Sequence, residues 1–445
     1  MMAANPMLDG PLLPLLARLA LPTVVVMFLV TLLSVAETYF VSVIGTDAIA
    51  AASLVVPVIL LMTMVSNGGI GGGVSSAIGR ARGAGQEDEA QSLAWHAFVL
   101  GLIFGLGFTL VLWMVGPTLY HFLGGRGASL EQAVLYSNIL FGGAAASWVL
   151  TLLQSALRGT GNVKVPALII ASSVFIGLLI SPALISGWYG LPPLGVAGAG
   201  VAQVLTNLIG LSSVVVYMRS KRSSLRLQPY PLRRDHFAAI LRVGLPSSVN
   251  AAMSNLALTA VTAAAGSFGV DAIAGYGIAS RIDSLLVPIL FGFGTAALTV
   301  VATNLGARQV ARARRAAILN AIFVACLLEG LGLLLAFWPE LWLGWFTHNP
   351  EVLKVGALYL LIVGPTYGLS AISMELYFAG QGASRIGWPM VATATRLAFA
   401  VLATALAASG SVSLSVAFFL VAAGVVASAV ISLWGFARTS WEEKR

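Results

Sequence analysis

The stretch "LPTVVVMFLVTLLSVAETYFVSVIGTDAIAAASL" (residues 21–54) decides the fold, because it holds an apolar run long enough to cross a lipid bilayer. A helix needs about 20 consecutive apolar residues to do so. The whole chain has the same character, since 58% of its 445 residues are hydrophobic and only 9% are charged. Soluble domains carry about 25% charged residues. We therefore predict an integral membrane protein whose spans are α-helices, because the runs are too long for barrel strands.

Charged residues, glycines and prolines separate the apolar runs into twelve segments. This pattern predicts an all-α polytopic protein with twelve transmembrane helices. The expected spans are 16–44, 48–79, 92–116, 131–157, 163–186, 195–218, 243–267, 272–304, 315–338, 351–379, 387–409 and 412–437.

The Lys and Arg residues predict how these helices are oriented. If both termini are cytoplasmic, the outer loops hold only Arg126 and Lys354 of the 24 basic residues. Arg281 and Arg396 lie inside spans, and the others fall on the inner side. Such a bias is typical of cytoplasmic loops, so we expect a multi-pass protein of the cell (inner) membrane with both termini in the cytoplasm. The same location explains the net charge of +8 without nucleic acid.

The two halves of the chain resemble each other. "ARLALPTVVV" (17–26) matches "LRVGLPSSVN" (241–250), which aligns two prolines. "GTDAIAAASL" (45–54) matches "GVDAIAGYGI" (269–278) at the same separation along the chain. A constant separation over several landmarks indicates a duplication.

A basic loop lies between the halves. The stretch "RSKRSSLRLQPYPLRRDHFAAILR" (219–242) is the most polar part of the chain. We predict an N-terminal six-helix lobe over 1–218, a cytoplasmic linker over 219–242 and a C-terminal six-helix lobe over 243–445. Six is an even number, so the lobes have the same orientation and form a parallel pseudo-two-fold repeat, which is typical of secondary transporters.

Four further stretches carry a family resemblance, together with the aligned prolines and "GTDAIAAASL". They are "GGGVSSAIGRARGAG" (71–85), "RGTGNVKVP" (158–166), "LGVAGAGVAQVLTN" (194–207) and "GVDAIAGYGIASRIDSLL" (269–286). In order and spacing the chain resembles the multidrug and toxic compound extrusion (MATE) family over nearly its whole length. The resemblance implies an ion-driven exporter of large organic compounds, cationic and amphipathic, with two lobes that form a V around a central cavity.

Glu37 lies inside the first span, where a carboxylate costs about 2.5–3.5 kcal/mol at the helix centre. The resemblance implies that it belongs to the cation-coupling site, where the family carries an Asp. Members that bind sodium also place an Asn and an Asp before a Pro in the fifth span, and here these positions are Gly177 and Ser181. A Thr of the sixth span is replaced by Gln203.

These departures bear on which ion is coupled to transport. Hard cations take several oxygen ligands, and Glu37 with only Gln203 and Asn207 nearby makes a poor cage. A buried carboxyl, in contrast, suits a proton, because burial disfavours its charged form. We therefore expect Glu37, Gln203 and Asn207 to couple transport to H⁺, with Na⁺ as the alternative.

The second half carries its own polar residues within the spans. Arg281 and Asp283 are two positions apart, so their side chains do not face each other on a helix. Glu375 either handles protons or substrate, or pairs with Arg396. Glu329 matches no landmark of the family. We expect roles in the substrate cavity or in gating for Asn250, Asn255, Arg281, Asp283 and Glu375.

Other function classes fit the sequence less well. The four histidines have no metal-ligand spacing, and no HExxH motif indicates a membrane enzyme. We expect no enzymatic activity, no metal and no organic cofactor, small organic substrates and the lipid bilayer as partners, and a monomer. Two alternatives stay open, a flippase of lipid-linked saccharides and a polytopic membrane enzyme. The four acids against two bases within the spans disfavour the anionic cargo of a flippase.

Overall fold

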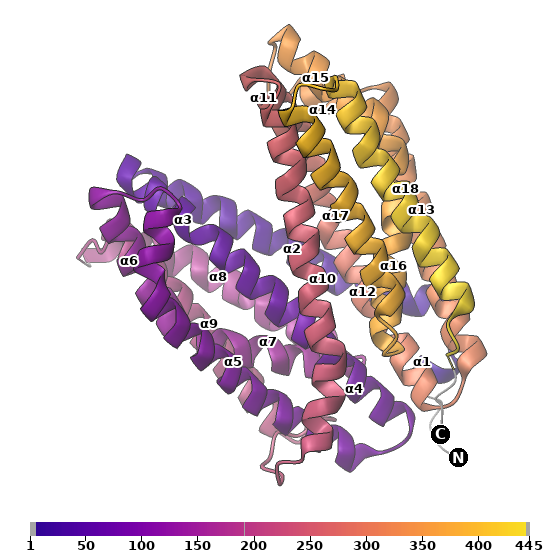
Figure 1. Cartoon of the computed structure of the whole chain (residues 1–445). Helices are drawn as coiled ribbons and strands as arrows, with labels where there is room; N and C mark the ends of the chain where they lie inside the picture. The colour runs from indigo at the N-terminus through magenta and orange to yellow at the C-terminus, as the bar shows by residue number, and fades with distance from the viewer. Residues whose placement is uncertain (1–5, 191, 442–445) are drawn as a thin grey trace. The chain divides into compact units, whose positions relative to one another are not determined.

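The computed structural model describes residues 6–190 and 192–441, and every regular element in them is a helix (Figure 1). The predicted all-α class is therefore confirmed. Lys444 and Arg445, two of the bases expected on the inner side, lie outside the described residues. The α-helices are α1 (Pro6–Asp9), α2 (Leu12–Ser42), α3 (Thr46–Thr63), α4 (Gly71–Gly83), α5 (Glu87–Phe122), α6 (Gly127–Gly142), α7 (Ala144–Gly159), α8 (Lys164–Ser186), α9 (Val196–Arg219), α10 (Arg234–Gly266), α11 (Val270–Ala279), α12 (Arg281–Gly306), α13 (Val310–Phe337), α14 (Glu340–Leu343), α15 (Pro350–Val363), α16 (Tyr367–Gly382), α17 (Gly387–Ala408) and α18 (Leu414–Arg438). A π-helix, η1 (Met64–Ile70), and two 3₁₀ turns, η2 (Trp188–Gly190) and η3 (Gly364–Thr366), complete the elements.

The described helices include 10 segments long and apolar enough to cross a membrane, or up to 11 if α6 and α7, bent by 47° at their junction, form one span. Helix α10 coincides with the seventh predicted segment but is not among them, because polar residues such as Asn250 and Asn255 lower its hydropathy. The multi-pass membrane class is confirmed, whereas the number twelve stays a prediction.

The structure divides into two compact units, each built from two parts of the chain. Unit 1 comprises Met1–Val24 and Leu245–Arg445, and unit 2 comprises Val25–Gly244. Helices α2 and α10 therefore each contribute one end to each unit. Both helices contain a proline near the point of division, Pro22 and Pro246. The lobe boundaries expected from the sequence stay a prediction, and the packing adds this exchange of helix ends.

Close backbone packing holds the first half of α2 in unit 1. A side chain at Gly292 of α12 would come within 3.2 Å of the Ala20 carbonyl oxygen and would overlap Val24. Leu16 and Ala20 are fully buried. Apolar contact of these buried residues and the narrow gap left by Gly292 therefore account for the position of this part of α2.

The first half of α10 packs in unit 2 in the same way. A Cβ atom at Gly244 would lie 3.0 Å from the Ile70 Cα atom, and one at Gly73 would overlap the Ile240 carbonyl. The linker expected over 219–242 is also ordered against this unit, because Leu225 is fully buried. The basic loop is therefore a packed strap and not a free tether.

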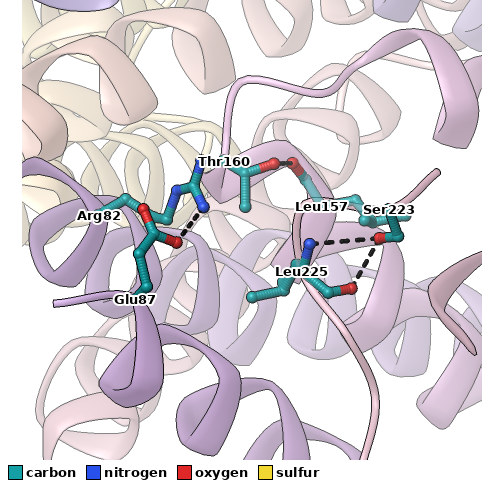
Figure 2. Close-up of polar contacts among 6 residues, drawn as sticks. All are labelled: Arg82, Glu87, Leu157, Thr160, Ser223 and Leu225. Carbon is teal, nitrogen blue, oxygen red and sulfur yellow. Dashed lines mark hydrogen bonds and ion pairs between the residues drawn. The ribbon is translucent and has the colours of Figure 1, made fainter. Parts of the chain in front are cut away.

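Polar contacts close the loops at this end of unit 2, as Figure 2 shows. Arg82 at the end of α4 forms an ion pair with Glu87 at the start of α5. The Ser223 hydroxyl donates to the Leu225 carbonyl at 2.7 Å and accepts from the Leu225 N–H at 3.3 Å. This local turn places the Leu225 side chain on the core of unit 2.

Two histidines fasten the linker to α5. The Arg233 backbone N–H donates to Nε2 of His96 at 2.8 Å, and the His96 Nδ1 lies 2.7 Å from the Ser92 carbonyl oxygen. His236 Nδ1 is hydrogen-bonded to the Ser92 hydroxyl at 2.9 Å, and the two imidazole rings are 4.8 Å apart. A doubly protonated imidazole has no lone pair, so His96 accepts from Arg233 only when it is neutral.

Glycines of the stretch "GLIFGLG" (101–107) allow α5 to approach α7 closely. A Cβ atom at Gly101 would lie 2.8 Å from the Val149 Cα atom, and one at Gly105 would lie 2.8 Å from the Ala145 nitrogen. Gly107 faces open space in contrast. Small residues at such positions are what allow helix backbones to meet in a membrane.

We expect Gly105→Ala to destabilise the protein, because its methyl group overlaps backbone that can move only with the whole of α7. Overpacking costs about 1–3 kcal/mol. Gly107→Ala, in the same helix, is the matched control and should gain up to about 1 kcal/mol from helix propensity. Thermal unfolding of the purified protein in detergent would check both variants. Equal melting temperatures for the two would contradict the packing described.

We also expect acidification to loosen the linker. Burial lowers the pKa of His236, which lies in the linker before the expected span, and His96 and Arg233 act in the same direction. The unfolded segment then binds more protons, so stability is complete above the ordinary His pKa of about 6.5 and falls as the pH drops towards the lower folded pKa. Hydrogen-exchange protection of residues 219–244, corrected for intrinsic rates, should fall by up to about tenfold per pH unit in that window.

His236→Asn should flatten this pH dependence, because its side chain does not titrate. His348→Gln, at an exposed histidine outside unit 2, should leave it unchanged. Protection that is independent of pH in the wild-type protein would count against the role of His236.

Candidate functional site

Glu37 lies in the second half of α2, within unit 2, and is half-buried. Its Oε1 accepts a long hydrogen bond, 3.5 Å, from the hydroxyl of Ser181 in α8. Ser181 is fully buried and precedes Pro182. The structure thus places the predicted coupling residue in contact with Ser181, the position at which sodium-binding relatives were expected to carry an Asp. A hydroxyl can donate to a carboxylate and accept from a carboxylic acid, so this contact survives protonation of Glu37.

Gly177, the other altered position of the expected cage, lies on α8 one turn before Ser181 and approaches Leu33 of α2. A Cβ atom built there would meet the Leu33 side chain at 3.4 Å and the Thr206 Oγ1 at 3.8 Å, which are ordinary contacts. The position therefore supplies no ligand, although a side chain would fit there.

Thr206 of α9 is a residue that the sequence reasoning missed. It is buried, and its Oγ1 has no hydrogen-bond partner in the part of the chain that the structure describes. Its place beside Gly177 and Leu33 brings a third polar side chain near the surroundings of Glu37. The signal was present in "LGVAGAGVAQVLTN", which ends on this Thr and Asn207.

Gln203 and Asn207 lie one helical turn apart on α9 and contact each other. The Gln203 Nε2 donates to the Asn207 Oδ1 at 3.4 Å. Neither side chain is hydrogen-bonded to Glu37 among the contacts of the described residues. The structure therefore places the Ser181 hydroxyl, and not the predicted amide pair, in contact with the carboxylate.

The basic and acidic residues at the start of α12 have separate partners, as their spacing predicted. Asp283 Oδ2 accepts from the Tyr359 hydroxyl at 2.8 Å. Arg281 is exposed and lies over the ring of Phe346, 5.7 Å from its centroid. No ion pair joins Arg281 and Asp283 in the part of the chain that the structure describes.

Glu375 of α16 is buried inside unit 1 and contacts an amide. The Asn320 Nδ2 of α13 donates to Glu375 Oε2 at 2.5 Å. Only 1% of Glu375 and none of Asn320 is exposed. Arg396, considered as a partner from the sequence, instead donates to the Ser370 hydroxyl at 3.5 Å. Asn320 is thus the partner that sequence alone did not indicate.

The amides of α10 lie in different surroundings. Asn250 is buried, and none of the described residues forms a hydrogen bond with its Oδ1. Asn255 lies one turn further on, where its carbonyl accepts from the Thr259 hydroxyl at 3.1 Å. Near Asn250, the Gln381 Nε2 donates to Ser247 Oγ at 2.9 Å.

Glu329 has a structural task. Its Oε2 accepts from the Gly368 backbone N–H at 2.8 Å, at the first turn of α16. A carboxylate at a helix N-terminus satisfies an unpaired donor and favours the helix dipole. The sequence showed the acid but not this partner, because the two residues belong to different helices.

The comparisons with known proteins agree with this organisation. The family model MatE matches the chain twice, over residues 22–183 and 246–407. Each match begins at the proline, Pro22 or Pro246, that the two halves share. The duplication predicted from the sequence therefore coincides with two copies of one family unit.

Curated relatives match most of the chain. A FAD transporter of Shewanella oneidensis is 27% identical over 364 residues, which cover 81% of this chain and 80% of the relative. A probable multidrug resistance protein NorM of Thermotoga maritima is 25% identical over 390 residues, which cover 85% and 82%.

Solved structures show the same fold. A crystal structure of MATE in complex with MaD3S superimposes on this chain with a TM-score of 0.88 at 23% identity and covers 97% of both chains. A transporter of the MOP superfamily from Pyrococcus furiosus, described as having a binding pocket of reverse polarity, gives a TM-score of 0.87 at 23% identity and the same coverage. The two matches to the MatE model cover well over half of the chain, and it therefore belongs to the MATE family of multidrug-efflux membrane transporters, which are not enzymes.

Proposed function

We propose that this transporter is a secondary antiporter that exports organic, cationic and amphipathic compounds in exchange for inward H⁺, with Glu37 as the coupling residue. The observation that carries the proposal is the contact of Glu37 with the Ser181 hydroxyl beside the empty ligand position Gly177. An intramembrane carboxylate with a neutral partner is the arrangement expected of a proton relay.

Proton binding to Glu37 changes the cost of keeping it in the membrane. The ionised side chain requires solvation, whereas the neutral acid is stable with one hydroxyl partner. Glu37 lies on the same helix as Pro22, which interrupts the backbone hydrogen bonds of α2. We propose that protonation from outside repacks α2 and expels substrate, and that release of the proton inside resets the cycle.

Sodium is the weaker coupling candidate. A Na⁺ site would need several oxygens, and Glu37 and Ser181 supply two side chains only. Thr206 adds a third oxygen in the neighbourhood, while Gln203 and Asn207 contact each other. We propose that Gln203 and Asn207 support the site as uncharged polar neighbours and do not bind a metal ion.

The acidic residues within the spans support a cationic substrate, but one relative supports an anionic substrate. The FAD transporter covers four fifths of this chain, and FAD carries negatively charged phosphates. Export of a flavin dinucleotide is therefore the second candidate function. A flippase of lipid-linked saccharides also has an anionic cargo, which the acids within the spans disfavour.

The remaining expectations concern surroundings and accessory residues. We propose a monomer in the cell membrane with both termini in the cytoplasm, as the distribution of Lys and Arg predicts. For Asn250, Asn255, Arg281 and Asp283 of unit 1 we propose substrate contact or gating.

In proteoliposomes loaded with ethidium or FAD, we expect Glu37→Gln to reduce efflux driven by a pH gradient at least about a hundredfold, because the amide cannot bind and release the coupled proton; a hundredfold in rate corresponds to about 2.7 kcal/mol. The amide has the shape of the protonated acid, so the variant should remain folded. Asp47→Asn removes an exposed carboxylate of the same unit and is the matched control.

The two substrates separate the candidates. Proton-driven efflux of ethidium and not of FAD supports the cationic class, and the opposite result supports the flavin. Normal transport by Glu37→Gln with either substrate would overturn coupling at Glu37.

A gain-of-function variant tests the choice of ion. Gly177→Asn combined with Ser181→Asp installs the two side chains of sodium-binding relatives, and the space at Gly177 accommodates the first of them. We expect a Na⁺ gradient alone to drive efflux in the double variant but not in the wild-type protein. Efflux by the wild-type protein in a Na⁺ gradient at equal pH would show that the proposed ion is wrong.

A further inference from the structure

We propose that Glu375 and Asn320 form a second proton-binding site, buried within unit 1 and separate from Glu37. The inference goes beyond the coupling proposed above, because it concerns another unit and rests on other residues. Glu375 lies in α16 and Asn320 in α13, two helices that pack along each other.

The hydrogen bonds of this pair are incomplete unless a proton is added. The Asn320 Nδ2 donates to Glu375 Oε2 at 2.5 Å. The other two oxygens, Glu375 Oε1 and Asn320 Oδ1, are both buried and have no hydrogen-bond partner among residues 6–190 and 192–441. In the ionised state both are acceptors only, so neither can satisfy the other.

A proton on Glu375 resolves this conflict with the atoms already present. The acid then has an O–H donor at Oε1, and Asn320 Oδ1 is the acceptor carried by the same amide. A carboxylic acid and a primary amide form two parallel hydrogen bonds in this way, and each partner is both donor and acceptor. Leaving these two buried oxygens unpaired is unfavourable, because each has lost its hydrogen bonds to water without a replacement.

No countercharge in the described residues offers an alternative. Glu375 forms no ion pair in the described part of unit 1. The charged side chains on the helices packed against α16 contact other groups. On α12, Arg281 lies over Phe346 and Asp283 accepts from Tyr359. On α13, Arg312 contacts the Gly10 carbonyl, Arg314 lies over the ring of Phe436, Glu329 contacts the Gly368 N–H, and Arg315 lies at an exposed cavity. On α17, Arg396 contacts the Ser370 hydroxyl, and on α18, Arg438 lies over the ring of Trp434.

The position of the pair within its helices favours a role in proton uptake. Asn320 lies about 15 Å along α13 from its first residue, at 1.5 Å per residue, and is therefore within the membrane. Burying an ionised carboxylate there without a partner charge is costly. Glu375 therefore binds a proton when the site is buried, and it can release that proton only when the site is exposed. We infer that Glu37 in unit 2 and Glu375 in unit 1 each bind a proton, and that these two sites together move up to two protons in one transport cycle.

Infrared difference spectroscopy of the full-length protein in lipid tests the site directly. A protonated carboxylic acid gives a carbonyl-stretch band that ionised carboxylates lack and that shifts in D₂O. At neutral pH we expect Glu375→Gln to lose one such band, and Asn320→Leu to shift the same band. Glu37→Gln should retain it. Glu329→Gln is the matched control, because that carboxylate is held by a backbone N–H.

Folding and transport measurements complete the test. Glu375→Gln preserves both hydrogen bonds to the amide, so its melting temperature should equal that of the wild-type protein, while the protons moved per substrate fall by one. An unchanged infrared band in Glu375→Gln would overturn the inference, as would a band that Na⁺ removes. If Glu37→Gln transports normally while the Glu375 band vanishes as expected, only the coupling proposed for Glu37 fails.

Discussion

The constraint on which this structure depends is that lipid offers no hydrogen bonds to the backbone. Each span must satisfy its own N–H and C=O groups, and helices do so. Lipid gives little hydrophobic drive for helix association, so the helices hold together by close contact over small residues. Gly105 against Ala145 in unit 2 and Gly292 against Ala20 in unit 1 are such contacts. The polar site residues are positioned by helices whose spacing these glycines set.

The same solvent explains the surroundings of the buried acids. Glu37 contacts the Ser181 hydroxyl, and Glu375 contacts the Asn320 amide. Both partners are neutral, whereas a Lys or Arg partner would hold the carboxylate permanently ionised. Glu329, in contrast, contacts a backbone N–H at a helix end and satisfies a donor that has no partner within the helix. Acids that look alike in the sequence therefore differ in what they can do, and the partner decides the difference.

The sequence predicted much of this fold because its signals are local. Apolar runs indicated the helices, a repeated Pro22 and Pro246 indicated the duplication, and a lone acid in the first span indicated Glu37. The partners were harder to predict, since Asn320 of Glu375, Gly368 of Glu329 and Thr206 beside Gly177 come from other helices. Which residues meet depends on helix rotation and crossing, and the spacing within one helix does not contain that information.

The exchange of helix ends has a consequence for how the chain is made. Residues up to Val24 are synthesised before unit 2, but the rest of unit 1 begins at Leu245 and follows it. The first turns of α2 must therefore wait, with Leu16 and Ala20 facing lipid or other temporary partners, until the second half of the chain has been inserted. Contacts so distant in sequence form late and at a high entropic cost. Folding of unit 1 is thus complete only when the first turns of α2 pack against helices of the second half, and a ribosome that stalls midway leaves unit 2 without α10 and the start of α2 without its docking surface.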